Sequence, residues 1–575
     1  MNTTDTGHAN MGPSAMADGR LRVAFLVGQD NASTRLSIEY VCRVPNVIPV
    51  TVLVDTQKDT LAKRLRNLRR NVRREGLSYL FFRALLGLRE IFDHWTAKVA
   101  PPAEVEQLLR KAFPAACFSL HDLAAIYGFE VAEVGNLNGD SAAKRLSQCS
   151  ADLGLVLGTR ILKRTTFAVP RLGCVNLHKG KVPEFRGMPP GFWELYQGCS
   201  SAGVTVHFVD DRLDTGDIVG TAEVPIHPKE TPESLKTKLD EAGAHLLAST
   251  VADLIVGKAT RTPQPPTQQK PWSTPTRVQR RELQRRLPHW RVQSDASEAF
   301  KTFFHLILFH CGIYRSVRWF RRRRGAILLY HRVNDYSIDV LTTSCRRFAE
   351  HLIVLSRNYK VVASNRLVEC LMKGIQFPPG TVVVHFDDCY RDVYSYAAPL
   401  LRAAGLPATA FVSSGFIDTD RAFAHDEQKY PHVFENFRSQ DVCALAKYGL
   451  DIGAHTVNHA DLGSVELDQA RLEVFESRHQ LEQILGTPVS LFSFPFGGLD
   501  NIREEVRQLV RQAGYQALFS AHGGFVESST DRFDIPRVGV SSEHSALCLM
   551  MDLEGLSVSQ LRHRFAKKQV RASET

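Results

Sequence analysis

A proline-rich stretch near the middle of the chain constrains the fold more than any other feature. Residues 260–276 have the sequence TRTPQPPTQQKPWSTPT, which contains five prolines. Such a composition favours a stiff, extended connection, because proline cannot continue a helix or donate to a strand ladder. A chain of 575 residues also exceeds the usual size of one hydrophobic core. The sequence therefore predicts two domains joined by a linker at 259–295.

The first predicted domain covers residues 20–258 and follows a loose tail at 1–19. Short apolar runs at 21–28 and 151–157 indicate buried strands, and helical patterns separate them. This alternation is typical of a doubly wound, Rossmann-like α/β domain. A basic helical pattern at about 60–111 predicts an insertion into it.

The second predicted domain covers residues 325–565. Apolar runs such as 326–331 and 381–386 alternate with helical segments, which favours a distorted (β/α) barrel with its chemistry at the carboxyl ends of the strands. Residues 296–324 predict an amphipathic helix ending in RSVRWFRRRR. The block 315–324 suits either peripheral contact with an acidic membrane surface or a docking helix with a solvated basic end.

Charge and cysteine content narrow the class of protein. The formal charge of +10 is concentrated in three arginine-rich stretches rather than spread over a domain, so we expect no nucleic-acid partner. The eleven cysteines include no CxxC pair, which favours a reducing compartment. The first twenty residues lack the pattern of a secretory signal, and no apolar run is long enough to span a bilayer. We therefore expect a cytoplasmic protein.

Three polar residues mark a candidate site in the first half. Asn176 and His178 lie two positions apart at the end of a predicted strand, so both side chains face one side. Asp214 follows on the next strand and turn. An amide, an imidazole and a carboxylate suit transfer of a formyl group between nitrogens: Asn176 stabilises the oxyanion, and His178 and Asp214 handle protons.

The motifs around these residues resemble a known family. The Asn-x-His strand, the Pro-x-x-Arg-Gly segment and the Leu-Asp-x-Gly turn occur in the order found in methionyl-tRNA, glycinamide ribonucleotide and sugar-nucleotide formyltransferases. The resemblance covers about residues 20–257 and implies 10-formyltetrahydrofolate as the donor. It places the cofactor beside the Asp214 turn and one loop, formed by Leu157, Gly158, Thr159 and Arg160. Gly180-Lys181-Val182-Pro183 departs from the family pattern, so the acceptor edge can differ.

A second set of polar residues marks a candidate metal site. Asp387 and Asp388 follow a buried apolar strand, where two carboxylates need a cation or a proton to compensate them. His455 and His459 have a spacing that lets two imidazoles share a metal. We expect Asp388, His455 and His459 to be the ligands and Asp387 to be the general base.

This half resembles the polysaccharide deacetylase family over about residues 325–540. HFDDCYRD and GAHTVNHADL correspond to its Phe-Asp-Asp-Gly and His-Ser/Thr-x-x-x-His motifs, and FSFPFGG and IPRVGV match more loosely. The resemblance implies one divalent ion, usually zinc, that supports hydrolysis of an N-acyl group on a sugar. We expect Arg537 to orient Asp387, and the backbone N–H of Phe496 to serve the oxyanion hole.

The late Leu-x-His element of that family, which supplies its general acid, is absent from the C-terminal region. Leu329-Tyr330-His331 has this pattern at the start of the domain instead. The first and last strands of a closed barrel are neighbours, so His331 can occupy the same place through circular permutation. A structural histidine is the alternative.

These sites predict a bifunctional enzyme acting on an amino sugar. One half removes an N-acetyl group, and the other formylates the amine. One alternative is a formyltransferase fused to a deformylase that acts on an N-formyl sugar. Another is a transfer-RNA formyltransferase with an accessory hydrolase.

Overall fold

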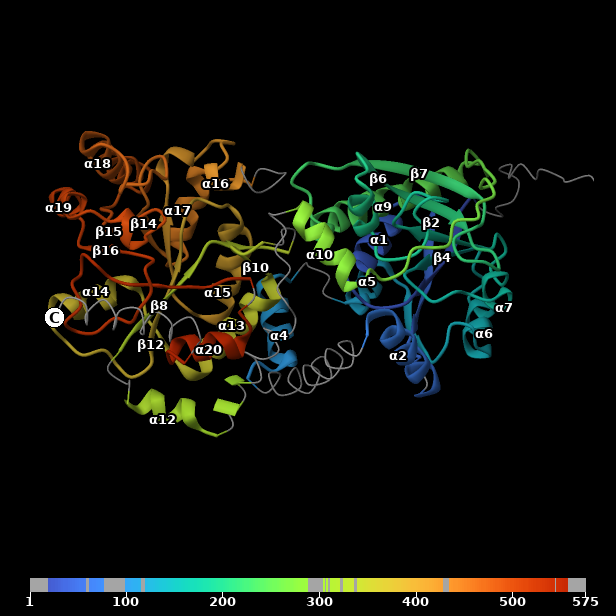
Figure 1. Cartoon of the computed structure of the whole chain (residues 1–575), viewed down its shortest axis with the longest axis horizontal. Coiled ribbons are helices and arrows are strands. Elements are labelled where there is room, and N and C mark those ends of the chain that lie inside the picture. Colours follow the sequence, from blue (N-terminus) through green and yellow to red (C-terminus); the bar gives the residue numbers. More distant parts are fainter. Residues whose placement is uncertain are drawn as a thin grey trace, which may run out of the picture. The chain divides into compact units, whose positions relative to one another are not determined.

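The computed structural model divides the chain into two compact units, described separately here. Unit 1 comprises residues 1–79 and 116–292, and unit 2 comprises 80–115 and 293–575 (Figure 1). The structure describes residues 19–57, 61–76, 99–114, 119–287, 304–305, 307–308, 311–320, 324–335, 339–427, 434–542 and 544–556. Residues 1–18 of the predicted tail, part of the predicted insertion and all of residues 288–303 lie outside the described residues.

Unit 1 is built on one seven-stranded sheet with the order β3-β2-β1-β4-β5-β6-β7. Strands β1 to β5 are parallel to their neighbours, and β6 and β7 continue the sheet antiparallel. The strands are β1 Leu21–Val27, β2 Val47–Asp55, β3 Glu130–Val134, β4 Leu153–Leu157, β5 Cys174–His178, β6 Ser201–Phe208 and β7 Ile218–Pro225. Their apolar side chains fill cores on both faces of the sheet, which confirms the predicted doubly wound architecture.

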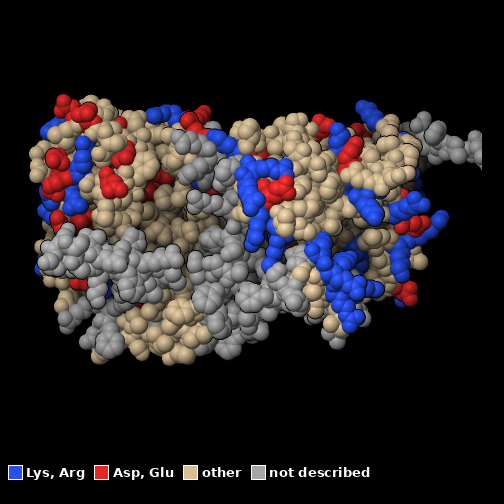
Figure 2. All heavy atoms as spheres, in the orientation of Figure 1, with Lys and Arg blue, Asp and Glu red and all other residues tan. Residues whose placement is uncertain are grey.

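Helices cover both faces of this sheet. The described helices of unit 1 are α1 Ala32–Cys42, α2 Leu61–Glu75, α5 Leu120–Tyr127, α6 Asp140–Gln148, α7 Arg164–Phe167, α8 Phe192–Gln197, α9 Pro232–Ile255 and α10 Arg277–Arg286. Ile38 of α1 and Leu247 of α9 pack in one core, and Leu146 of α6 packs in the other. Side-chain caps fix several starts: Asn31 accepts from Thr34 N before α1, for example. Figure 2 shows basic side chains gathered over the arginine-rich helices α2 and α10.

The centre of the sheet contains a topological switch point. Strand β1 lies between β2 and β4, so the connections that leave β1 and β4 diverge. Gly28, after β1, approaches Gly158, after β4, so closely that an added Cβ would lie 2.0 Å from the Gly158 carbonyl oxygen. Open α/β sheets bind ligands in the crevice at such a point.

The proline-rich segment differs from the extended linker expected at 259–295. Thr262 pairs with Ile218 at the end of the sheet, and Trp272 pairs with Gly187. The Trp272 ring also stacks on Trp193 with 4.4 Å between ring centroids. Aromatic burial and backbone pairing thus hold part of this segment, which we call the strap (residues 262–276), on unit 1.

Unit 2 contains a curled sheet of parallel strands. The order is β16-β15-β14-β13-β12-β8-β17, and β11 also pairs with β12. The strands are β8 Ala326–Tyr330, β11 Lys360–Val361, β12 Thr381–Phe386, β13 Thr409–Val412, β14 Asp451–Ala454, β15 Leu491–Ser493, β16 Ala517–Phe519 and β17 Val538–Gly539. Strands β9 Arg332–Val333 and β10 Thr342–Thr343 form a separate pair. This architecture agrees with the predicted distorted barrel.

Helices surround the curled sheet. They are α4 Pro102–Ala112, α12 Ile313–Phe320, α13 Cys345–Asn358, α14 Ser364–Met372, α15 Ala398–Ala404, α16 Ala424–Glu427, α17 Ser439–Lys447, α18 Leu467–Leu485, α19 Glu504–Gln512 and α20 Ala546–Leu553. A π-helical turn at Val393–Ala397 and 3-10 turns at Ser414–Phe416 and Leu499–Asn501 complete the described elements. None of the described helices is both long and apolar enough to cross a membrane.

Helix α4 belongs to unit 2, although its residues fall within the insertion expected for the first domain. Lys111 Nζ donates to the carbonyl oxygen of Ala403, in the last turn of α15, at 2.6 Å. Glu104 forms an ion pair with Arg357 of α13, and the rings of Phe113 and Tyr396 lie 6.3 Å apart. Part of the predicted insertion therefore packs outside the sheet into which it is inserted.

Candidate active sites

In unit 1, the antiparallel pairing of β5 and β6 brings four polar side chains together. Asn176 and His178 face one side of β5, and His207 of β6 stands opposite Asn176 in the register. Asp214 lies in the turn that follows β6 and has a φ of 53°. A non-glycine residue in the left-handed region costs free energy, and such residues are concentrated at functional sites.

The Asn176 amide is held on both sides. Its Nδ2 lies 3.2 Å from His207 Nε2 and 3.4 Å from Asp214 Oδ1. His207 Nδ1 lies 2.8 Å from the carbonyl oxygen of Phe208, which only a protonated Nδ1 can satisfy. His207 Nε2 is then an acceptor for the Asn176 amide in the neutral ring. His207 thus orients Asn176, a role that the sequence did not assign to it.

His178 is held by the loop that follows β5. Its Nε2 donates to the carbonyl oxygen of Phe185 at 2.8 Å, which leaves Nδ1 facing Asp214 Oδ2 at 3.5 Å. Gly180 permits this arrangement, because a Cβ there would lie 2.4 Å from the Phe185 oxygen and 2.7 Å from His178 Nε2. Burial lowers the pKa of His178 below its ordinary value, and Asp214 opposes the shift. The lowered pKa favours the neutral ring, whose unprotonated Nδ1 faces Asp214.

The pKa of Asp214 lies below its ordinary value. Burial acts in the opposite direction, but the imidazoles of His207 and His178 favour the carboxylate. The strap also reaches this turn: Gln264 Nε2 donates to the carbonyl oxygens of Asp214 at 3.1 Å and Gly216 at 2.7 Å. The sequence predicted a passive linker here and missed Gln264, because a lone glutamine in a proline-rich stretch carries no recognisable pattern.

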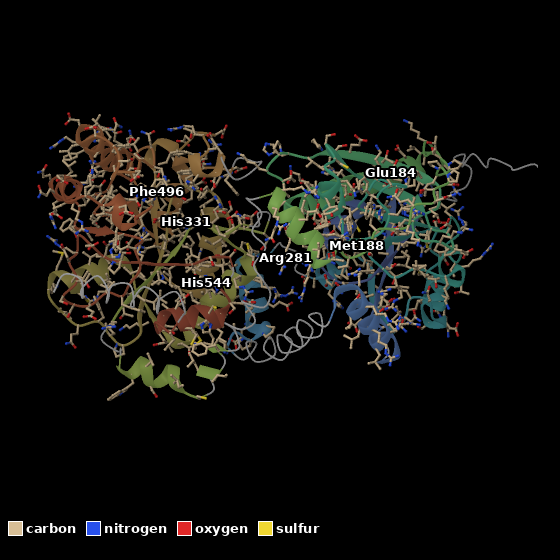
Figure 3. The ribbon with its side chains drawn as sticks, viewed as in Figure 1. Glu184, Met188, Arg281, His331, Phe496 and His544 are labelled. Atoms are coloured by element: carbon tan, nitrogen blue, oxygen red, sulfur yellow. The ribbon has the colours of Figure 1, made fainter. Side chains whose placement is uncertain are left out.

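The strap also joins the loop that carries Arg186 and Gly187. Arg186 donates to the carbonyl oxygen of Gln269 at 2.7 Å, and Trp272 Nε1 donates to that of Glu184 at 3.0 Å. Figure 3 labels Glu184 and the neighbouring Met188, whose side chain is 62% exposed. The strap and this loop thus form one continuous border of the unit 1 site.

The predicted cofactor loop lies at the carboxyl end of β4, beside the switch point. Leu157 ends the strand, Gly158 has a φ of 63°, and Thr159 Oγ1 donates to the carbonyl oxygen of Arg160. The Arg160 side chain pairs with Asp55 at 2.5 Å, and its guanidinium also donates to Gln57. Any contact from Arg160 to a folate therefore comes most directly from its backbone, because Asp55 and Gln57 already occupy its side chain.

In unit 2, two strand ends supply the predicted metal ligands. Asp387 and Asp388 follow β12, while His455 follows β14 and His459 lies in the loop beyond it. Asp388 has a φ of 78° and His459 a φ of 54°. Parallel strands carry their carboxyl ends to one edge, which explains why residues far apart in sequence meet there.

Asp388, His455 and His459 form a group whose ligand atoms all lie within 4.8 Å of one another. Asp388 Oδ1 lies 3.1 Å from His459 Nε2 and 3.6 Å from His455 Nε2. His455 Nδ1 donates to the carbonyl oxygen of Ser493, so its Nε2 lone pair faces the carboxylate. Asp388 Oδ2 is buried without a hydrogen-bond partner among the described residues. Converging acceptors with one unsatisfied oxygen fit a divalent cation.

Asp387 is bound by an arginine instead. Arg537 donates to both of its carboxylate oxygens at 2.7 Å, and Ser493 Oγ donates to one of them at 3.3 Å. Arg537 Nε also donates to the carbonyl oxygen of Ser520. Burial opposes ionisation of Asp387, but Arg537 holds its pKa below the ordinary value. The neighbouring carboxylates of Asp387 and Asp388 thus have different partners.

His331 lies at the same edge as the metal group. It immediately follows β8, whose Tyr330 stands beside Phe386 of β12 in the register. Its Nδ1 is buried and has no hydrogen-bond partner in the described part of the chain. Burial lowers the pKa of His331, and Asp388 and Asp387 oppose the shift. Because β17 also pairs with β8, the first and last strands are neighbours, as the permutation hypothesis requires.

Phe496, labelled in Figure 3, borders this site and is exposed. It has a φ of 62° and is 53% exposed, and its ring lies 4.9 Å from that of His459. His425 of α16 lies on another side, with its ring 5.4 Å from that of His459. The sequence did not indicate His425, because it is far from both recognised motifs.

A buried glutamate supports the ligand loop. The Glu473 carboxylate on α18 accepts from the backbone N–H groups of Val457 and Asn458, both at 2.8 Å, and from Asn458 Nδ2 at 2.8 Å. These bonds fix the segment between His455 and His459. Sequence analysis missed Glu473 because one glutamate on an amphipathic helix resembles an ordinary surface residue.

Comparisons with protein families identify two regions of the chain. Residues 102–251 match the family model described as formyl transferase, and residues 374–518 match the one described as polysaccharide deacetylase. Each match covers about a quarter of the chain. The first begins at α4, the helix that packs in unit 2.

Curated relatives match the first region. The methionyl-tRNA formyltransferase of Lachnospira eligens is 34% identical over 140 residues, which cover 24% of this chain and 44% of that protein. The methionyl-tRNA formyltransferase of Bacillus cytotoxicus is 41% identical over 99 residues, which cover 17% of this chain and 32% of that protein. The chain thus spans less than half the length of these relatives.

Two solved structures resemble parts of the chain. A Streptococcus pyogenes deacetylase in complex with acetate is 19% identical with a TM-score of 0.35, over 40% of this chain and 98% of that chain. Glycinamide ribonucleotide transformylase 1 from Symbiobacterium toebii is 16% identical with a TM-score of 0.28, over 42% of this chain and 89% of that chain.

Proposed function

Because the chain contains a formyl transferase domain and a polysaccharide deacetylase domain, both of them enzymatic, we propose that it is a bifunctional enzyme of amino-sugar metabolism. Unit 2 hydrolyses an N-acetyl group from an amino sugar in a metal-dependent reaction. Unit 1 transfers a formyl group from 10-formyltetrahydrofolate to an amino-sugar amine. The pairing is chemically coherent, since hydrolysis of an amide exposes the kind of nucleophile that formyl transfer consumes.

Asp387 is bound by Arg537, whereas Asp388 lies beside His455 and His459. This difference between neighbouring carboxylates is the observation that supports hydrolysis most directly. Asp388, His455 and His459 would hold one divalent ion, which we expect to be zinc. Such an ion supplies Lewis acidity that polarises the acyl carbonyl and makes a water molecule more acidic. Asp387, kept ionised by Arg537, accepts a proton from the attacking water. His331, whose neutral form is favoured by burial, must first take up a proton and then donates it to the departing amine.

In unit 1, three side chains support formyl transfer: Asn176, His178 and Asp214. The Asn176 amide stabilises negative charge on the formyl oxygen at the transition state. His178 Nδ1 and Asp214 Oδ2 face each other at 3.5 Å, so they can share the proton that the attacking amine releases. The loop at 157–160 would border the folate at the switch point of the sheet.

Two alternatives predict different products. If unit 2 removes formyl rather than acetyl, the two units oppose each other or act at different stages. If transfer RNA is the formyl acceptor, as the names of the curated relatives indicate for those proteins, the hydrolase is accessory.

One experiment separates these functions. The purified full-length protein is incubated with zinc, 10-formyltetrahydrofolate and a panel of N-acetyl and N-formyl nucleotide sugars and oligosaccharides, and the products are weighed by mass spectrometry. Loss of an acetyl mass followed by gain of a formyl mass supports the proposal. Hydrolysis of N-formyl sugars alone, or formylation of methionyl-tRNA alone, contradicts it.

Matched variants assign each reaction to its unit. Asp388→Asn is expected to abolish hydrolysis and bound zinc while formyl transfer continues, because the change removes a charged metal ligand. Asn176→Ala is expected to abolish formyl transfer while hydrolysis and bound zinc are retained. Loss of both activities in either variant, with folding intact, contradicts two separate sites.

A further inference from the structure

His425 is held on one side of the predicted metal group by a buried network of hydrogen bonds. Its Nε2 lies 3.0 Å from the Tyr390 hydroxyl, which donates to Asp426 Oδ2 at 2.5 Å. Arg332 donates to both oxygens of Asp426 at 3.0 Å. Tyr390, Asp426 and Arg332 are all almost completely buried, whereas the His425 side chain is 17% exposed. His425 is therefore the member of this network nearest to solvent.

The network determines which nitrogen of His425 carries the proton. Asp426 is bound by a buried guanidinium and is therefore a charged acceptor, so the single Tyr390 proton goes to it. The Tyr390 oxygen must then accept from His425, which requires a proton on Nε2. The neutral ring consequently has an unprotonated Nδ1. This nitrogen makes no hydrogen bond to any residue that the structure describes.

The position of His425 makes it a neighbour of the metal group rather than a member. Its ring lies 5.4 Å from that of the ligand His459, and Phe423 packs against both rings at 5.6 Å and 5.3 Å. The described residues whose ligand atoms converge within 4.8 Å are Asp388, His455 and His459. His425 thus offers a hydrogen-bond acceptor on a ring that lies next to a residue of the metal group.

We propose that His425 is a substrate-binding residue of unit 2, whose Nδ1 accepts a hydrogen bond from a sugar hydroxyl near the scissile amide. This inference rests on the proposed sugar hydrolase activity. A hydroxyl matches the site because it can donate to a neutral acceptor and needs no compensating charge. The network through Tyr390, Asp426 and Arg332 holds the imidazole in the accepting tautomer. Binding of a substrate therefore costs little free energy for ordering the His425 side chain.

The test compares two probes that share an acetyl group. Tri-N-acetylchitotriose carries hydroxyl groups, whereas 4-nitrophenyl acetate has no hydrogen-bond donor. We expect His425→Ala to lower kcat/KM for the chitotriose about tenfold to a hundredfold, mainly through KM, because one hydrogen bond to the substrate is lost. Metal-dependent hydrolysis of 4-nitrophenyl acetate and the zinc content are expected to remain unchanged.

Further variants separate the acceptor from the shape of the side chain. His425→Asn places an amide oxygen near the position of Nδ1 and is expected to recover part of the lost activity, whereas His425→Leu is not. His479→Ala on the surface of α18 is the matched control and should leave both probes unaffected. An equal loss with both probes, or loss of zinc in His425→Ala, would overturn the assignment.

A spectroscopic measurement tests the network without turnover. Histidine-labelled protein is examined by nitrogen-15 NMR, and the His425 signals are assigned by their loss in His425→Asn. We expect an unprotonated Nδ1 and a protonated Nε2, and a change of this pattern in Tyr390→Phe. A proton on Nδ1 in the wild-type protein overturns the proposal. If the wild type cleaves 4-nitrophenyl acetate but no acylated sugar, the proposed function fails, while the spectrum still decides the state of His425.

Discussion

Arg537 donates one hydrogen bond to each carboxylate oxygen of Asp387, at 2.7 Å in both cases. Both side chains are buried, so neither charge has water as an alternative partner. The guanidinium is itself fixed by the carbonyl oxygen of Ser520. Asp387 is therefore kept ionised and correctly oriented before any substrate binds.

Replacement of Arg537 should affect both activity and folding. We expect Arg537→Ala to reduce kcat for hydrolysis at least a hundredfold and to destabilise the protein by about 3 kcal/mol, because an unpaired buried carboxylate remains. Measurements of kcat, zinc content and urea unfolding test this. Arg511→Ala, which removes a partly exposed arginine of α19, is the control. A stable Arg537→Ala protein with normal kcat would contradict the role assigned to the pair.

The strands and their order of appearance could largely be predicted from sequence, because buried apolar runs leave local patterns. Clustered polar motifs also pointed to residues that the structure brings together, such as Asp388, His455 and His459. The strap could not, since its attachment depends on pairing between Trp272 and Gly187, which are far apart in the chain. His425 and Glu473 were missed for the same reason. Each acts through residues on other elements, and no spacing in the sequence reports such contacts.

Glu194 of α8 predicts a pH-dependent stability. It is buried, no lysine or arginine among the described residues pairs with it, and burial raises its pKa to about 7. A raised carboxyl pKa means that the folded state retains the proton more strongly than the unfolded state. Its effect on stability is thus most favourable below about pH 4 and declines as the pH rises to about 7.

We therefore expect Glu194→Gln to be more stable than the wild type by about 3 kcal/mol at pH 8 and nearly equal to it at pH 4. Urea unfolding of unit 1 at both pH values, followed by tryptophan fluorescence, measures this difference. Glu233→Gln, in the first turn of α9, is a control that should show little pH dependence. If the difference in stability between Glu194→Gln and the wild type were the same at pH 4 and pH 8, folding would not raise the pKa of Glu194.

Glu473 is expected to control metal affinity without touching the metal. Glu473→Gln replaces the carboxylate that accepts two backbone N–H groups of the ligand loop, so the positive-φ conformation of His459 loses support. We expect zinc affinity to fall about tenfold to a hundredfold. Competition with a chelator measures it, and Glu476→Gln, exposed on the same helix, is the control. Equal zinc affinity in both variants would refute this role.

Gln264 is expected to matter for formyl transfer although it lies in the strap. Gln264→Ala removes the two donations that hold the carbonyl oxygens of Asp214 and Gly216. The positive-φ turn should relax, and formyl transfer should fall about tenfold while hydrolysis by unit 2 is retained. Gln269→Ala is the matched control, because Gln269 contributes its backbone oxygen to Arg186. Unchanged formyl transfer in Gln264→Ala would mean that the strap lines the unit 1 site without supporting the Asp214 turn in catalysis.

The segment around α12 predicts binding to anionic membranes. Ile313 and Trp319 are exposed on this helix, as are Phe304 and Ile307 before it, and the sequence places arginines at 315, 318 and 321–324. We expect the protein to sediment with vesicles that contain phosphatidylglycerol and not with phosphatidylcholine alone. Trp319→Glu should weaken this binding several-fold, and Val278→Glu, on exposed α10, should not. Equal binding to both kinds of vesicle would exclude a role for the arginines.

Because α4 belongs to unit 2, the backbone passes between the two units more than once. The backbone leaves unit 1 near residue 80, contributes α4 to unit 2, returns near residue 116 and leaves again near residue 293. The two units therefore share three crossings of the backbone instead of one. A protease that cuts once between 288 and 303 would divide the chain in two, but the N-terminal fragment would keep α4, whose contacts are with unit 2. A recombinant fragment that starts after the strap would lack this helix, which packs against α13 and α15.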